Sequence, residues 1–336
     1  MTSTQNPSGS PQPGPHPEAQ SAVQPGTQAE FGIWGPSAHQ TEHVPTRAPK
    51  TKQPWGGLFT LWGFLGILAA QLLTLPIFIG MVMAGDASID FESPTLEDDI
   101  ISAFTDVVLS GPGLVVALVS QWAVFLGIPW LATRLKGAKS MAKDLGLRFK
   151  VSDIGVSLAL AVAMQASLIG LGFLATAIGI DTDAADNTGI VTEQVGLTLV
   201  IIIFATAVMA PLTEEVFFRG MVLRSLLRSW AKVDLADPHP ISEGHFGPDK
   251  ASARRRKIGT VLAVLMSAVF FGVLHTPFSD GTNEVPLASS LFLIFQTGFL
   301  GAIFAVIALR TRRIGLPIVA HLWFNSSSVA MVMLFT

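Results

Sequence analysis

The side chains best suited to chemistry in this sequence lie within or at the ends of long apolar stretches. Ionisable groups are costly inside a membrane, and where they occur they usually serve a function. Three such clusters occur along the chain. They contain Glu214, Glu215 and Arg219 in the first stretch, His275 in the second, and His321 and Asn325 in the third.

Helical spacing assigns different roles to the two neighbouring glutamates. Glu215 and Arg219 are four residues apart, so on a helix they share a face and can form an ion pair. Glu214 is rotated by about 100° from Glu215 and is left without that partner. Glu214 is therefore the better candidate for a reactive carboxylate, with Glu215 and Arg219 as supporting residues.

The remaining polar groups can complete a hydrolytic site around Glu214. His321 and Asn325 are also four residues apart, and His275 supplies a second imidazole from another helix. If the three stretches converge, Glu214 and His275 can activate a water molecule by general base catalysis. His321 and Asn325 can then donate hydrogen bonds to the oxyanion of a tetrahedral intermediate.

The same residues leave the question of a metal cofactor open. Zinc accepts two histidines and one glutamate with an open fourth position, so Glu214, His275 and His321 are possible ligands. The helical HExxH spacing of many zinc proteases is absent, however, and a metal-independent mechanism is equally compatible with the sequence. The chain has no cysteine, which excludes thiolate ligands and a cysteine nucleophile.

The elements that must position these groups are transmembrane helices. Half of the 336 residues are hydrophobic and only 13% are charged, whereas a soluble domain carries about 25% charge. Apolar residues come in blocks of about twenty, the length that spans a bilayer. We expect an all-α bundle of about seven transmembrane helices. The predicted spans are 55–84, 112–132, 154–179, 195–219, 258–276, 287–309 and 314–335.

Two segments outside the spans have distinct compositions. Residues 1–53 are polar and rich in Pro, Gln and Ser, so we expect a disordered cytoplasmic tail before a membrane domain over 54–336. Residues 93–110 place apolar side chains at helical spacing among acids, which predicts a short amphipathic helix on the membrane surface. Tryptophans near the predicted span ends suggest interfacial anchors. They are Trp55, Trp62, Trp122 and Trp130.

Charge in the loops predicts an orientation. Basic residues precede the first span and gather in the loops after the second, fourth and sixth spans, whereas the intervening loops are acidic. The positive-inside rule then places the N-terminus in the cytoplasm and the C-terminus outside, in a multi-pass plasma-membrane protein. The formal net charge of −3 gives no reason to expect nucleic acid as a partner.

The predicted depth of His275 conflicts with a shared site, because straight helices would separate His275 from Glu214. Counted from Lys257, His275 lies about 18 residues, or roughly 27 Å, along its span, whereas Glu214 lies near the opposite end of its own. The conflict is removed if the fourth span continues as helix through Arg228. It is also reduced if the basic run 254–257 extends the fifth helix into the cytoplasm.

Taken together, the motifs resemble a known family. EExxxR, FxxxH and HxxxN occur in this order on separate apolar spans, and Pro211 and Gly220 flank the first motif. This pattern is similar to that of the CPBP intramembrane proteases, which include type II CAAX prenyl endopeptidases and bacteriocin-processing and immunity proteins. The resemblance covers roughly residues 195–330.

The resemblance implies roles for the motif residues. It makes Glu214 the catalytic carboxylate, supported by Glu215 and Arg219, and assigns His275, His321 and Asn325 to water or oxyanion contacts. It implies an endopeptidase acting on a membrane-associated protein or peptide, with either a metal-dependent or a glutamate-based mechanism. Prenylated CAAX substrates belong to eukaryotic members, so the resemblance does not name the substrate.

Other interpretations of the same residues predict different structures. The first cluster can be a membrane-boundary group whose Arg219 reaches the lipid headgroups, and His321 with Asn325 can be hydrogen-bonding contacts between helices. Glu214 and the histidines can also form the relay of a proton-coupled transporter. A non-catalytic scaffold would tolerate replacement of all of them.

Overall fold

The computed structural model describes residues 55–84, 95–182, 195–235, 250–276 and 286–335, and all regular elements in these ranges are helices. Seven of them are long and apolar enough to cross a membrane. The all-α polytopic class is thus confirmed. The tail predicted over 1–53 lies outside the described residues. The candidate spans are Leu58–Ala84, Gly111–Lys136, Asp153–Ala177, Gly196–Ala231, Ala253–Val273, Leu287–Thr311 and Gly315–Phe335.

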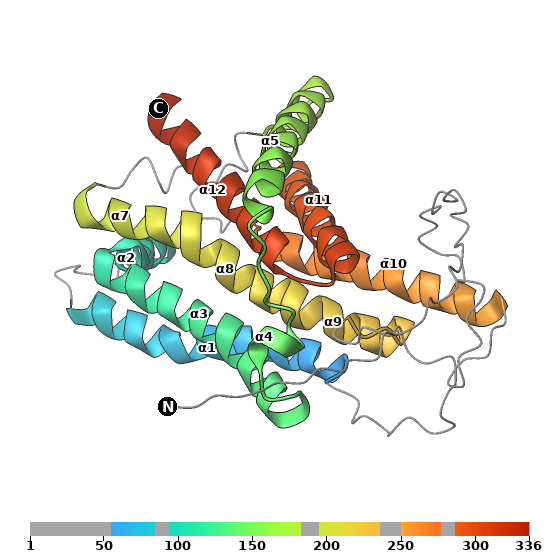
Figure 1. Ribbon diagram of the computed structural model, residues 1–336. Coiled ribbons are helices and arrows are strands. Elements are labelled where there is room, and N and C mark those ends of the chain that lie inside the picture. The colour runs from blue at the N-terminus through green and yellow to red at the C-terminus, as the bar shows by residue number, and fades with distance from the viewer. Residues whose placement is uncertain (1–54, 85–94, 183–194, 236–249, 277–285, 336) are drawn as a thin grey trace, which may run out of the picture. The chain divides into compact units, whose positions relative to one another are not determined.

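The fourth span extends well beyond residue 219, where the predicted span ends. It runs for 36 residues as one continuous rod, and Figure 1 shows its labelled parts α7, α8 and α9 in line. Three π-helical segments interrupt its α-helical parts. In chain order the parts are α7 (Gly196–Phe204), η2 (Ala205–Met209), α8 (Ala210–Glu214), η3 (Glu215–Val222), α9 (Leu223–Leu226) and η4 (Leu227–Ala231). The continuation through Arg228 is confirmed, and it places Glu214 in the middle of the span.

Helix α10 (Lys250–Val273) includes the basic run 254–257, as expected, and packs against η4. Their closest approach is at Gly259, where an added Cβ would lie 2.6 Å from the carbonyl carbon of Trp230. Sixteen residues separate Trp230 from Glu214, and sixteen separate Gly259 from His275. The two helices are antiparallel, so counting back from Trp230 and forward from Gly259 leads in the same direction in space. The equal separations therefore bring His275 beside Glu214.

A second contact sets the depth of α12 (Gly315–Phe335). The turn between α11 (Leu287–Thr311) and α12 contacts the fourth span at Arg224, which donates a hydrogen bond to the backbone carbonyl of Arg312 over 3.3 Å. Ten residues separate Arg224 from Glu214, and nine separate Arg312 from His321. Because these two separations are nearly equal, His321 lies at about the same depth as Glu214.

The other helices surround this centre. Helix α1 (Leu58–Ala84) packs against α3 (Gly111–Lys136), and α5 (Asp153–Ala177) packs against α12. Asp153 at the start of α5 pairs with Arg313 beside the α11–α12 turn. The expected helix after residue 93 is confirmed as α2 (Leu96–Leu109), and a short α4 (Met141–Asp144) follows α3.

Trp55 does not behave as the interfacial anchor that was expected. It is only 2% exposed, and the guanidinium of Arg228 lies 4.3 Å from its ring centroid. Two residues later, the backbone N–H of Gly57 donates to the hydroxyl of Ser229. The beginning of the membrane domain is thus attached to the last turns of the fourth span, which explains the burial of this tryptophan.

The contact between α10 and α11 depends on a glycine. A Cβ on Gly272 would lie 2.3 Å from the carbonyl oxygen of Ile294, whereas nothing lies within 4 Å of the corresponding position on Gly170 in α5. Replacing Gly272 with alanine forces the two backbones apart. We expect Gly272→Ala to lower the free energy of unfolding by about 1–3 kcal/mol.

The matched control is Gly170→Ala, which makes the same chemical change at an open position and should not lower stability. Thermal unfolding of the purified proteins in detergent measures both. Equal midpoints for Gly272→Ala and Gly170→Ala would contradict the close backbone contact.

Candidate active site

The first motif forms an ion pair that is completely removed from solvent. Glu215 Oε1 lies 3.0 Å from Arg219 Nη1, and both side chains are 0% exposed. The pairing predicted from their spacing is therefore present. The alternative in which Arg219 reaches the headgroups is wrong, because its guanidinium is enclosed by protein.

Aromatic rings and one carbonyl enclose the guanidinium of Arg219. Its central carbon lies 4.4 Å from the ring centroid of Phe271 and 5.2 Å from that of Phe304, close enough for cation–π attraction. Nη2 also donates to the carbonyl of Gly301 over 3.0 Å. Arg219 thus joins the fourth span to α10, through Phe271, and to α11, through Phe304 and Gly301.

The same carboxylate orients His321 on α12. Glu215 Oε1 lies 3.1 Å from Nδ1 of His321, and the imidazole stacks on Phe304 with centroids 4.8 Å apart. An ionised carboxylate only accepts hydrogen bonds, so Nδ1 carries a hydrogen. The other ring nitrogen, Nε2, is then directed to Glu214, 4.0 Å from Oε2.

His275 presents its ring to Glu214 in the same manner. Its Nδ1 lies 2.7 Å from the carbonyl oxygen of Phe271, which can only accept, so Nδ1 again carries the hydrogen. Its Nε2 lies 3.8 Å from Glu214 Oε1. The expected difference in depth between His275 and Glu214 is thus removed by the register of the two helices.

Glu214 differs sharply from its neighbour. It is buried, but among the described residues only the two imidazoles lie within ion-pair distance of its carboxylate. The separations of 3.8 and 4.0 Å exceed a direct hydrogen bond, which spans about 2.7–3.2 Å. Each gap is wide enough for one bridging water molecule.

A cavity of about 260 Å³ contains these groups. Glu214, His275, His321 and Asn325 all line it, so the structure brings together the residues that the sequence predicted as a site. Their catalytic roles stay a prediction. Other walls come from several helices, and include Leu118, Gln121, Trp122, Thr206, Thr213, Thr297 and Phe324.

No cavity role was predicted from the sequence for several lining residues, among them Trp122 and Gln121. Trp122 was expected at the membrane interface but lies in the middle of α3, where it lines the cavity. Gln121 beside it was not singled out. An amide in an otherwise apolar span was the available signal, because polar groups in such helices usually face the protein interior.

Asn325 has a partner that the sequence did not predict. Its Nδ2 donates to the carbonyl of Thr206 over 2.8 Å. Thr206 lies in the π-helical segment η2, and such segments occur often at functional sites. One amide hydrogen is therefore used to hold the side chain against the fourth span, and the second hydrogen can serve another acceptor.

Imidazole and carboxylate groups are common metal ligands, but the arrangement of these groups in the cavity does not form a clear metal site. Both histidines have Nδ1 fixed by an acceptor, as is usual for metal-ligating histidines. However, within the described ranges no group of three or more His, Asp or Glu side chains is placed to hold one ion. The assignment of Glu214, His275 and His321 as ligands stays a prediction.

Comparison with known proteins agrees with this geometry. Residues 196–327 match the family model described as "Type II CAAX prenyl endopeptidase Rce1-like". This part of the chain is similar to that family. The match begins at the first residue of α7 and ends within α12, so the Rce1-like region contains the three motifs and confirms the resemblance to CPBP proteases.

The Rce1-like match indicates a peptidase, and the seven candidate spans indicate a multi-pass membrane protein. No curated protein and no solved structure matches the chain.

The buried pair generates a stability prediction. Replacing Arg219 with methionine keeps much of the side-chain volume but leaves Glu215 buried without its cation. We expect Arg219→Met to lower the free energy of unfolding by about 3–5 kcal/mol. Thermal unfolding in detergent is the measurement.

The matched control is Arg310→Met, because Arg310 is exposed at the end of α11. This substitution should change stability by less than about 1 kcal/mol. In addition, the double variant Glu215→Gln/Arg219→Met should recover part of the lost stability. No recovery would contradict an unpaired carboxylate as the source of the loss.

Proposed function

We propose that the chain is an intramembrane endopeptidase in which Glu214 and His275 activate water and His321 and Asn325 stabilise the oxyanion. The observation that carries the proposal is the approach of two imidazole Nε2 atoms to the carboxylate of Glu214, which has no Lys or Arg within ion-pair distance among the described residues. The Rce1-like match supports peptide hydrolysis. It gives no support to proton-coupled transport, the alternative function for the same side chains.

The protonation pattern defines where the water binds. With Nδ1 of His275 hydrogenated, its Nε2 is an acceptor in the neutral ring, and an ionised Glu214 is also an acceptor. Two acceptors 3.8 Å apart require a donor between them. A water molecule at about 2.8 Å from each donates both hydrogens and keeps a lone pair free.

Attack by this water proceeds with balanced proton transfers. The water oxygen forms a bond to the scissile carbonyl carbon, and one of its protons passes to Glu214. The carbonyl π electrons move to the oxygen, which gives a tetrahedral oxyanion. Glu214 then returns the proton to the departing amine as the C–N bond breaks, leaving a carboxylic acid and an amine.

His321 and Asn325 lie where they can meet the developing negative charge. Donation from His321 Nε2 requires a hydrogen on that nitrogen in addition to the one that Nδ1 directs to Glu215. Asn325 contributes the amide hydrogen that does not bind Thr206. Donors directed at an oxyanion in a dry site commonly contribute 10²–10³-fold, roughly, to the rate.

The membrane setting follows the proposed chemistry. We infer that the substrate is a membrane-associated peptide or protein, because the reactive groups lie in the middle of the fourth span. The alternating basic loops further support a plasma-membrane protein with a cytoplasmic N-terminus. The CAAX description of the family suggests a farnesylated CAAX peptide as the first probe.

Removal of the Glu214 charge is the direct test of the mechanism. Glu214→Gln retains the shape of the side chain but cannot accept the proton from water. We expect kcat to fall by roughly 10³-fold or more, with unchanged thermal unfolding. The assay is cleavage of a farnesylated CAAX peptide and a panel of membrane-anchored peptides by protein reconstituted in vesicles.

Glu97→Gln is the matched control, since Glu97 is exposed on α2 and should be replaceable without loss of activity. Cleavage by Glu214→Gln at the wild-type rate would contradict the assignment. A folded wild-type protein that cleaves none of the probes but moves protons across the vesicle membrane would favour transport.

A chelator decides between the two mechanistic subtypes. We propose the glutamate-based subtype, because no three candidate ligands in the described residues are placed around one point. Dialysis against a strong chelator should then leave the cleavage rate unchanged. Loss of activity that zinc restores, with no change in thermal unfolding before zinc is added, would instead assign Glu214, His275 and His321 as ligands.

A further inference from the structure

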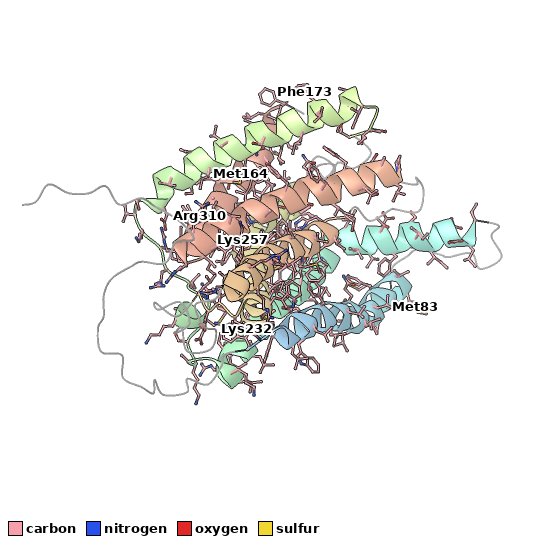
Figure 2. All side chains as sticks on the ribbon, turned by 90° about the vertical axis from the view of Figure 1, so that its right-hand side faces the viewer. Met83, Met164, Phe173, Lys232, Lys257 and Arg310 are labelled. Carbon is pink, nitrogen blue, oxygen red and sulfur yellow. The ribbon has the colours of Figure 1, made fainter. Side chains whose placement is uncertain are left out.

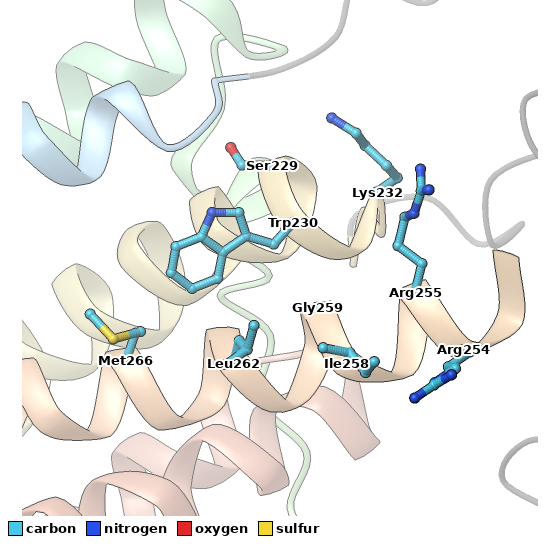
Figure 3. Close-up of a pocket in the computed structure, with 9 residues that line it drawn as sticks. All are labelled: Ser229, Trp230, Lys232, Arg254, Arg255, Ile258, Gly259, Leu262 and Met266. Carbon is cyan, nitrogen blue, oxygen red and sulfur yellow. The ribbon is translucent and has the colours of Figure 1, made fainter. Parts of the chain in front are cut away.

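A second hollow lies away from the proposed catalytic cavity, between η4 and α10. It has a volume of about 810 Å³, and its walls contain none of the catalytic candidates. Figure 3 shows the residues that line it, namely Ser229, Trp230, Lys232, Arg254, Arg255, Ile258, Gly259, Leu262 and Met266. We call this hollow the η4–α10 groove.

The two ends of the groove differ in chemistry. Lys232 and Arg255 extend from the two elements at one end, while Trp230 lies toward Leu262 and Met266 (Figure 3). Among the described residues, no acidic side chain lines the groove, and neither Lys232 nor Arg255 has a carboxylate within ion-pair distance. The cationic end is therefore not neutralised by the described part of the protein.

The apolar part of the groove follows the membrane-spanning direction of α10. Ile258, Leu262 and Met266 are spaced by four residues, so they form a stripe about 12 Å long on one helix face. Trp230, Ile258 and Leu262 are each 40–48% exposed despite their size. This surface requires an apolar neighbour, and in a span that neighbour is hydrocarbon.

The position of the groove matches the boundary of a leaflet. Lys232 directly follows the fourth span, and Arg255 lies at the beginning of the fifth. In Figure 2, Lys232, Lys257 and Arg310 lie toward one end of the helices, whereas Met83 lies at the opposite end. Cations at a span end can contact the phosphate of a lipid headgroup, and the apolar stripe beside them can contact its acyl chain.

We propose that the η4–α10 groove is a binding site for an anionic phospholipid of the leaflet at the basic end of the spans. Its phosphate contacts Lys232 and Arg255, and one acyl chain lies along Trp230, Leu262 and Met266. The acyl chain of a zwitterionic lipid can also cover the apolar stripe, but its headgroup places a cation beside Lys232 and Arg255. Charge complementarity therefore selects an anionic headgroup. A free phosphate ion satisfies only the cations.

Trp230 provides a local readout. The purified full-length protein is placed in nanodiscs containing phosphatidylglycerol or phosphatidylcholine with brominated acyl chains, which quench nearby indoles. The contribution of Trp230 is the difference between the wild type and Trp230→Phe. We expect this contribution to be quenched at a much lower mole fraction of phosphatidylglycerol than of phosphatidylcholine.

Two variants test the two ends separately. Lys232→Gln/Arg255→Gln should weaken the preference for phosphatidylglycerol by roughly 30-fold. Ile258→Trp, measured by native mass spectrometry of retained lipid, should reduce binding by filling the groove while leaving the cations in place. The matched control Arg134→Gln/Lys136→Gln removes two exposed charges at the end of α3 and should keep the preference.

The outcomes separate the possible occupants. Equal quenching of Trp230 by the two lipids, or an unchanged preference in Lys232→Gln/Arg255→Gln, would overturn the proposal. Displacement of the lipid by millimolar inorganic phosphate would show a simple anion site and would overturn it as well. Because the readout is binding, its result is independent of whether Glu214 supports catalysis.

Discussion

The buried ion pair between Glu215 and Arg219 is the constraint on which the arrangement of the central helices depends. A carboxylate and a guanidinium removed from water lose several kcal/mol of hydration each, and their contacts with each other and with neighbouring groups must offset that cost. The remaining partners come from α10, α11 and α12, as Phe271, the Gly301 carbonyl and His321. None of these helices can move away without exposing a buried charge to an apolar surrounding. The pair therefore positions His321 before any substrate is present.

Two antiparallel registers then bring Glu214, His275 and His321 to one depth. The Trp230–Gly259 contact matches sixteen residues on each side, and the Arg224–Arg312 contact matches ten with nine. The sequence indicated the residue types, their faces and the extended fourth helix, because helical period and charge are local properties. It could not indicate the register, since that depends on a glycine allowing close backbone approach between distant segments.

Some residues of the cavity could be predicted from the sequence, whereas others depend on how the helices pack. Glu214, His275, His321 and Asn325 stood out because a polar group in an apolar span is visible in the sequence. Trp122 was misplaced because its amphipathic side chain suits both a membrane interface and a protein cavity, and only the packing of α3 distinguishes them. The bond from Asn325 to Thr206 was likewise invisible, because it depends on a π-helical segment of the fourth span.

The neighbouring glutamates show how one helix can give two adjacent carboxylates different partners. A rotation of about 100° per residue gives Glu215 to the arginine four residues later and directs Glu214 to the two imidazoles. Glu215 is paired with Arg219 and orients His321. Among the described residues, only the two imidazoles lie within ion-pair distance of Glu214. Under the proposed mechanism, Glu214 can therefore gain and lose a proton without breaking the buried ion pair, as general base catalysis requires.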